Sequence, residues 1–156
     1  MQQIIKVIIP AYNEEQSIGP VVRDIPHFVD EIIVVSNNST DATAAKSVEA
    51  GATSLTETSP GYGYACLKGL QYIAGLEDKP DIVVFLDGDY SDYPKQLTQL
   101  IKPILEDNID FVVGARVKSL RQPGSMTFPQ RFGNKLATTL MRLIFNSRLV
   151  GRLKCN

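Results

Sequence analysis

The sequence predicts an α/β fold in which a mostly parallel central sheet carries helices on both faces. Short apolar runs rich in Ile and Val alternate along the chain with longer stretches of helical periodicity. These runs are apolar at successive positions, which is typical of parallel strands that are covered on both faces. Because helical patterns separate the runs, the strands are expected to join through right-handed crossovers.

Five apolar runs are expected to form the strands of this sheet. They cover residues 4–10, 31–35, 52–57, 82–86 and 110–115. The third run is the weakest of the five, and the fourth, Ile-Val-Val-Phe-Leu, is the strongest. Pro10 is expected to end the first strand.

Helical patterns follow the first two strands. Ser17 is expected to cap a helix that continues to Ile25. Ser39 or Thr40 is expected to cap a second helix over 41–50, and the glycine that follows is a natural stop.

Three further helices are expected. After a loop at 59–63, one helix carries apolar residues at helical spacing, namely Leu67, Leu70, Ile73 and Ala74. Pro94 opens a helix to about residue 107, whose core-facing residues are Leu97, Leu100, Ile101 and Ile104. Residues 131–145 form an amphipathic pattern, with apolar positions at Leu136, Leu140, Leu143 and Ile144. This last helix either covers the sheet or lies at a membrane surface, and an exposed apolar face there would favour self-association.

Composition excludes several classes of function. The chain has 156 residues, of which 44% are apolar and 21% charged, as expected for one soluble domain. A net charge of −1 provides no broad basic field, so we expect no nucleic-acid partner. No apolar run approaches the roughly 20 residues that span a bilayer, and the first residues lack signal-peptide features. We therefore expect a cytoplasmic location.

Polar residues follow four of the five expected strands, at the point where each strand ends. They are Asn13 and Glu14, then Ser36 and Asn37, then Asp87 and Asp89, and finally Arg116. Ligands of open parallel sheets collect at the carboxyl ends of the strands. We therefore expect a binding site at this edge.

Asp87-Gly88-Asp89 is the sharpest of these signals. Two carboxylates one residue apart in a turn can reach a single hard cation, and Gly88 allows the backbone to approach closely. Mg²⁺ or Mn²⁺ prefers oxygen ligands and commonly shares its coordination with substrate phosphates. The alternative is a solvated acidic turn that caps the helix beginning at Pro94.

The other candidates are weaker when taken singly. The segment Pro10-Ala11-Tyr12-Asn13-Glu14 could hydrogen-bond a base or ribose, or be a loop that leads into a helix. Ser36-Asn37 could contact a nucleobase, because helix capping explains only the residues after them. Gly61-Tyr62-Gly63 is either a phosphate-binding loop or a flexible turn. Arg116 and Arg131 could neutralise phosphates, or be solvated surface residues.

Taken in order, these segments resemble the family 2 glycosyltransferases of the GT-A fold. The matching stretches are residues 7–14, 34–41, 61–65, 85–94 and 113–116. Arg116 and the segment Arg131-Phe132-Gly133-Asn134 resemble more narrowly the dolichol-phosphate mannosyltransferase-like branch, which transfers a sugar to a polyprenyl phosphate.

The resemblance implies roles for the matching residues. The nucleoside pocket would be lined by Pro10, Ala11, Tyr12, Asn13, Glu14, Ser36 and Asn37. Asp87 and Asp89 would hold Mg²⁺ or Mn²⁺ and the diphosphate, with Gly88 between them. Arg116 and Arg131 would contact phosphates of the donor or acceptor and, with Asp89, are the catalytic candidates.

The expected function is therefore transfer of a sugar from a nucleoside diphosphate sugar, with uridine or guanosine as the base. The expected acceptor is a lipid phosphate, which is already anionic and needs no general base. We expect one nucleotide-sugar-binding domain over 1–156, with 117–156 a partial acceptor-side extension. We expect the last helix to contact the inner face of the membrane peripherally. We also expect the chain to form a homo-oligomer through this helix.

Two departures from the family keep alternatives open. Ser36 stands where the family usually has an acid, and the chain ends before the family's acceptor-binding segment, so we expect a shortened chain. One alternative is a domain that binds a nucleotide sugar without turnover. Another is a haloacid-dehalogenase-like phosphatase, although its Asp-x-Asp motif normally ends the first strand. A sugar nucleotidyltransferase would need a Gly-rich loop containing Arg after the first strand, and residues 10–14 contain neither Gly nor Arg.

Overall fold

The computed structural model describes residues 3–107 and 109–114. The chain divides into two compact units, Met1–Thr98 and Gln99–Asn156, and each is considered by itself. Arg116, Arg131 and the expected helix over 131–145 lie outside the described residues.

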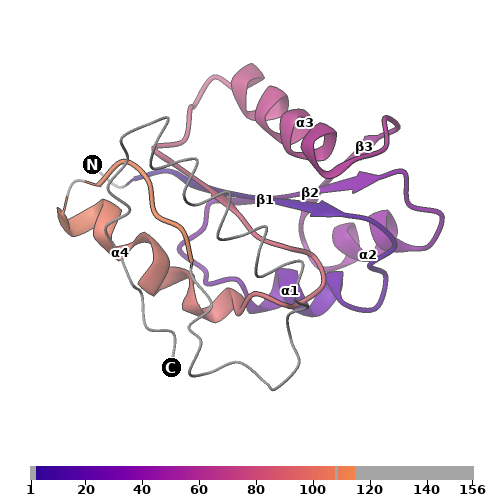
Figure 1. The fold of residues 1–156 in the computed structure, drawn as a ribbon, viewed down its shortest axis with the longest axis horizontal. Coiled ribbons are helices and arrows are strands. Elements are labelled where there is room, and N and C mark those ends of the chain that lie inside the picture. Colours follow the sequence, from indigo (N-terminus) through magenta and orange to yellow (C-terminus); the bar gives the residue numbers. More distant parts are fainter. Residues whose placement is uncertain (1–2, 108, 115–156) are drawn as a thin grey trace, which may run out of the picture. The chain divides into compact units, whose positions relative to one another are not determined.

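A four-stranded parallel sheet forms the centre of the first unit (Figure 1). Its strands are β1 (Ile5–Ala11), β2 (Glu31–Asn37), β3 (Thr53–Glu57) and β4 (Ile82–Phe85). They lie in the order β3-β2-β1-β4, so β1 is a central strand. All seven residues of β1 are buried, as the continuous apolar run predicted.

Helices cover both faces of this sheet. In Figure 1, α3 (Tyr62–Gly75) lies on one face, and α1 (Ile18–Asp24) and α2 (Thr43–Glu49) lie on the other. A short 3₁₀ turn over Pro94–Gln96 leads into α4 (Leu97–Asp107). The predicted α/β class with a parallel sheet and helices on both faces is confirmed.

Close packing of α3 on β1 depends on Gly69. Beneath α3 the core contains Ile8, Ile33, Val35, Ala65 and Ile73. A Cβ atom added to Gly69 would lie 2.7 Å from Cγ2 of Ile8, so only glycine allows this approach.

The buried side of α3 differs from its sequence pattern. Of the four apolar residues expected at helical spacing, only Ile73 is buried. Leu67 and Leu70 are 54% and 40% exposed, and Ala74 is also exposed. Small residues face the sheet because the helix lies so close to it, and this turns the leucines outward.

The start of α2 also differs from the prediction. The helix begins at Thr43, and neither Ser39 nor Thr40 caps it. Asp41 serves the first turn instead, because its Oδ1 accepts the Thr43 N–H at 3.0 Å. By contrast, Ser17 does occupy the cap position of α1, although its hydroxyl makes no capping bond to the helix.

The expected fifth strand is absent from its described part, residues 110–114. Phe111 and Val113 are 77% and 58% exposed there. An apolar run forms a strand only where a neighbouring strand pairs with it, and residues 110–114 have no such pairing. Within the described ranges, no helix is long and apolar enough to cross a membrane.

Candidate functional site

The carboxyl ends of β1, β2 and β4 lie at one edge of the sheet because all three strands are parallel. Ala11 at the end of β1 is paired with Ser36 on β2. Beyond β4, the Leu86 N–H donates to the Ile8 carbonyl at 3.1 Å, so the acidic turn begins beside β1. This is the edge at which the sequence predicted a binding site.

Gly88 brings the acidic turn against the segment that follows β1. A Cβ atom placed on Gly88 would lie 3.4 Å from Cβ of Ala11, 3.5 Å from the Pro10 carbonyl oxygen and 3.6 Å from Cγ of Glu14. These are ordinary contact distances, so the backbone at Gly88 lies directly against this segment. Two segments that are more than seventy positions apart in the sequence therefore meet at one place.

Hydrogen bonds fix the shape of the acidic turn. Oδ1 of Asp89 accepts the Ser91 N–H at 2.8 Å, and the Asp87 N–H donates to Oδ2 of Asp92 at 3.4 Å. Both bonds close the turn on itself. The carboxylates are thereby held in a defined geometry before any ligand arrives.

Tyr62 at the start of α3 also contacts this turn. Its hydroxyl donates to Oδ1 of Asp87 at 3.4 Å. Burial, together with the negative charge of Asp87, raises the pKa of Tyr62 to about 12. The phenol is therefore a donor at neutral pH. Sequence reasoning singled out the Gly61-Tyr62-Gly63 loop but missed this contact, because nothing local pairs a loop tyrosine with a distant aspartate.

The donor set suits a divalent ion that also binds a ligand. Within residues 3–107 and 109–114, no group of three His, Cys, Asp or Glu side chains converges on one point. Asp87 and Asp89 alone would supply only part of a coordination sphere. Mg²⁺ is commonly held in this way, by one or two carboxylates together with substrate phosphates and water.

Asn13 uses its side chain to hold the two neighbouring loops together. Its backbone is left-handed, with φ of 54°, a conformation that asparagine adopts more readily than most residues. Its Oδ1 accepts the Thr40 N–H at 2.9 Å, and its own N–H donates to Ser39 Oγ at 3.2 Å. The loop after β1 is therefore fastened to the loop after β2.

Glu14 and Glu15 extend this bracing. The Glu14 N–H donates to Thr43 Oγ1 at 2.8 Å, and the Glu14 carboxylate accepts a hydrogen bond from Ser17. The Glu15 carboxylate accepts the Ala42 N–H at 3.0 Å. Much of the polar character of this segment therefore serves the fold itself.

The Asn37 side chain likewise forms hydrogen bonds within the protein. It is 6% exposed, its amide nitrogen donates to the Ser59 carbonyl at 2.7 Å, and its amide oxygen accepts the Gly61 N–H at 2.8 Å. Ser36 is also buried, at 4% exposure. Tyr12 and Asn13 are the exposed members of the predicted pocket, and Tyr12 is 62% exposed.

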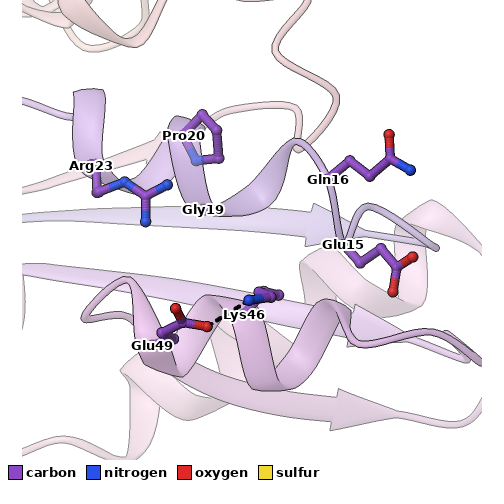
Figure 2. Close-up of a pocket in the computed structure, with 7 residues that line it drawn as sticks. All are labelled: Glu15, Gln16, Gly19, Pro20, Arg23, Lys46 and Glu49. Atoms are coloured by element: carbon purple, nitrogen blue, oxygen red, sulfur yellow. Dashed lines mark hydrogen bonds and ion pairs between the residues drawn. The ribbon is translucent and has the colours of Figure 1, made fainter.

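A separate groove of about 230 Å³ lies between α1 and α2 (Figure 2). Its lining consists of Glu15, Gln16, Gly19, Pro20, Arg23, Lys46 and Glu49. The two charges drawn together in Figure 2, Lys46 and Glu49, form an ion pair at 2.8 Å. The groove is smaller than most ligand sites, its charges are mixed, and none of the predicted site residues lines it.

The parallel sheet, with the acidic turn beside the first strand–helix loop, has the architecture of a GT-A domain. The family profile described as glycosyl transferase family 2 matches residues 6–154. The chain belongs to this family, and the predicted family resemblance is confirmed.

Relatives and solved structures agree with this assignment. The chain is 31% identical over 151 residues to a UDP-N-acetylglucosamine–dolichyl-phosphate N-acetylglucosaminyltransferase of Methanococcus voltae, covering 85% of this chain and 59% of the relative. It is 32% identical over 135 residues to a glucosyl-3-phosphoglycerate synthase of Mycolicibacterium smegmatis, covering 78% and 43%. The chain spans about half the length of the curated relatives it matches.

The structure resembles that of glucosyl-3-phosphoglycerate synthase from Mycobacterium tuberculosis, with a TM-score of 0.58 and 32% identity. The match covers 67% of this chain and 40% of that one. That crystal contains Mn²⁺, uridine diphosphate and glucosyl-3-phosphoglycerate, and another crystal of the enzyme contains Mg²⁺ and uridine diphosphate.

Proposed function

We propose that this chain transfers a sugar from a nucleoside diphosphate sugar, and that Asp87 and Asp89 hold the Mg²⁺ or Mn²⁺ that binds the diphosphate. The observation that carries the proposal is the contact of Gly88 with Pro10, Ala11 and Glu14. It places a pair of carboxylates beside the loop that follows the central strand. Family membership favours this chemistry over the phosphatase alternative.

The difficult step is departure of the nucleoside diphosphate, because negative charge builds on its phosphate. A bound divalent ion offsets that charge as a Lewis acid. The protein's part is to keep the carboxylates in place. Ser91 fixes Asp89, and Tyr62 together with Asp92 fixes Asp87.

The nucleoside would lie over the loops after β1 and β2. Tyr12 is 62% exposed and would contact the base directly. Asn13 and Asn37 would contribute by holding these loops in shape. Arg116 and Arg131 would contact phosphates, a role that rests on the family resemblance. Uridine is the favoured base, because the similar crystal structures contain uridine diphosphate.

The proposed acceptor is a lipid phosphate. Its anionic oxygen attacks the anomeric carbon without losing a proton, so no general base is required. A relative at 31% identity carries dolichyl phosphate in its name. Such an acceptor would bring the reaction to a membrane surface.

A second candidate is binding of the nucleotide sugar without turnover. The released nucleotide distinguishes the two candidates.

The test incubates the chain with Mn²⁺, dolichyl phosphate and, in turn, UDP-N-acetylglucosamine, UDP-glucose or GDP-mannose. The proposal predicts release of nucleoside diphosphate together with a glycosylated lipid for one donor. Tight binding without release would establish the second candidate. Tighter binding of adenosine diphosphate than of uridine or guanosine diphosphate would contradict the assignment of the base.

A further inference from the structure

We propose that Tyr90 and Asp24 form an anchor that sets the position of the Asp87–Asp89 turn and thereby its affinity for the metal. The inference rests on the proposed function of that turn. We assign Tyr90 and Asp24 as positioning residues, because the Tyr90 hydroxyl and the Asp24 carboxylate bond each other.

Tyr90 has a backbone conformation that needs support. It directly follows Asp89 and has φ of 62°, which lies in the left-handed region. Residues other than glycine rarely occupy this region, and bulky residues least of all, because their Cβ atom crowds the following carbonyl oxygen. Because residue 90 is a tyrosine and not a glycine, contacts with the surrounding structure are needed to stabilise its left-handed backbone.

The Tyr90 hydroxyl provides that interaction by donating a hydrogen bond to the carboxylate of Asp24. Asp24 is the last residue of α1, a helix whose buried residues include Ile18, Val21 and Val22. The tyrosine is therefore tied to an element that is fixed in the core. Sixty-six positions separate the two residues in the sequence.

Lys95, which lies after the acidic turn in the sequence, contacts the same carboxylate of Asp24. Its Nζ lies 3.3 Å from Oδ2 of Asp24, and the 3₁₀ turn that carries it contacts α1. The lysine side chain is 75% exposed, so the ion pair itself contributes little. The hydroxyl of Tyr90 is therefore the main element of the anchor.

Tyr90 is coupled to the metal-binding carboxylate through the backbone. It lies between Asp89 and Ser91, whose N–H donates to Oδ1 of Asp89 at 2.8 Å. If Tyr90 relaxed to a negative φ, this N–H would swing away and the Asp89 carboxylate would lose its orientation. Removing a residue that orients a metal ligand commonly weakens metal binding by roughly 10- to 100-fold.

The test uses Tyr90→Phe, Asp24→Ala, the double variant, and Tyr93→Phe as a matched control. Tyr93 undergoes the same chemical change three positions further on, and it is 66% exposed. Affinity for uridine diphosphate is measured by calorimetry in Mn²⁺ and in EDTA. The melting temperature of each variant is measured as well.

The anchor predicts that Tyr90→Phe and Asp24→Ala each weaken Mn²⁺-supported binding about tenfold, while binding in EDTA and the melting temperature change little. The double variant should be no weaker than either single variant, because the two residues act as one unit. Tyr93→Phe should bind like the parent.

Three results would overturn the inference and leave the proposed function standing. In the first, Tyr90→Phe retains the parent's Mn²⁺-supported affinity. In the second, the two single effects add in the double variant. In the third, binding in EDTA falls as much as binding in Mn²⁺, which indicates a general structural role. A parent chain whose binding is the same in Mn²⁺ and EDTA would instead remove the proposed function, and the anchor's role with it.

Discussion

Two polar clusters lie at opposite ends of the same parallel sheet and differ in their charges. At the amino end, Lys6 Nζ lies 2.6 Å from Oε2 of Glu31, and Oε1 of Glu31 accepts hydrogen bonds from Thr53 and Tyr72, each at 2.8 Å. At the carboxyl end, the turn over residues 87–92 contains three aspartates and no basic residue.

The amino-end cluster stabilises the fold, whereas the carboxyl-end cluster is the proposed binding site. Burial raises the pKa of Glu31, but hydrogen bonds from Lys6, Thr53 and Tyr72 outweigh it, and the pKa lies below its usual range. The folded protein therefore favours the charged carboxylate. In the acidic turn, like charges within six residues repel one another, and a divalent cation would lower that energy. We therefore expect substitutions at the two ends to affect different measurements.

Glu31→Ala should give the largest loss of stability. It leaves the largely buried Lys6 ammonium without its counter-charge, and Lys6 is only 9% exposed. Removing one partner of a buried pair costs about 3–5 kcal/mol, and partial exposure of Glu31 reduces this to about 2–3 kcal/mol in urea unfolding. The control is Glu49→Ala, which breaks an exposed pair with Lys46 and should leave the free energy of unfolding almost unchanged. Equal losses for the two variants would remove the distinction between a buried and an exposed pair.

Asn37→Ala should show that part of the carboxyl edge is structural. Its amide group satisfies the Gly61 N–H and the Ser59 carbonyl, so we expect a loss of about 1–3 kcal/mol in the free energy of unfolding. Nucleotide affinity, measured under conditions where the variant is fully folded, should change little. Weaker nucleotide binding with unchanged stability would restore Asn37 as a ligand contact, as the sequence first predicted.

The pH dependence of stability should report the amino-end cluster. Because the pKa of Glu31 is lowered on folding, its contribution is fully present above the unfolded value and is lost as the pH falls through the folded value. The stability difference between the parent and Glu31→Gln should therefore shrink as the pH falls below the usual range of a glutamate pKa. A difference that stays constant over this fall in pH would show that the glutamate's charge is not the source of its contribution.

The strands of the sheet were predictable because their signal is local. The first four runs become β1 to β4 with ends that differ by only a few residues, since a continuous apolar run needs cover on both faces. The fifth run was predicted to be a strand, but its described residues 110–114 form none. Strand formation depends on a pairing partner that the run itself does not specify. On α3, the close approach at Gly69 decided which side faces inward, and an amphipathic pattern does not contain that information.

The place of the candidate site was predictable, but the use of its side chains was not. Parallel strands bring their carboxyl ends together, which is why the segment after β1 and the acidic turn meet. The sequence does not reveal that Asn13 and Asn37 bind neighbouring loops, or that Tyr62 reaches Asp87. Each of these contacts joins residues that are more than twenty positions apart.

The most direct test of the acidic turn as a metal–diphosphate site is calorimetric titration of uridine diphosphate into the parent chain, Asp89→Ala and Asp78→Ala. Asp78 is an exposed aspartate in the connection between α3 and β4, so it controls for the loss of one negative charge. In Mn²⁺, Asp89→Ala should bind at least about 30-fold more weakly than the parent, which corresponds to about 2 kcal/mol, while Asp78→Ala should bind like the parent. Equal affinity of the parent and Asp89→Ala in Mn²⁺ would contradict the account.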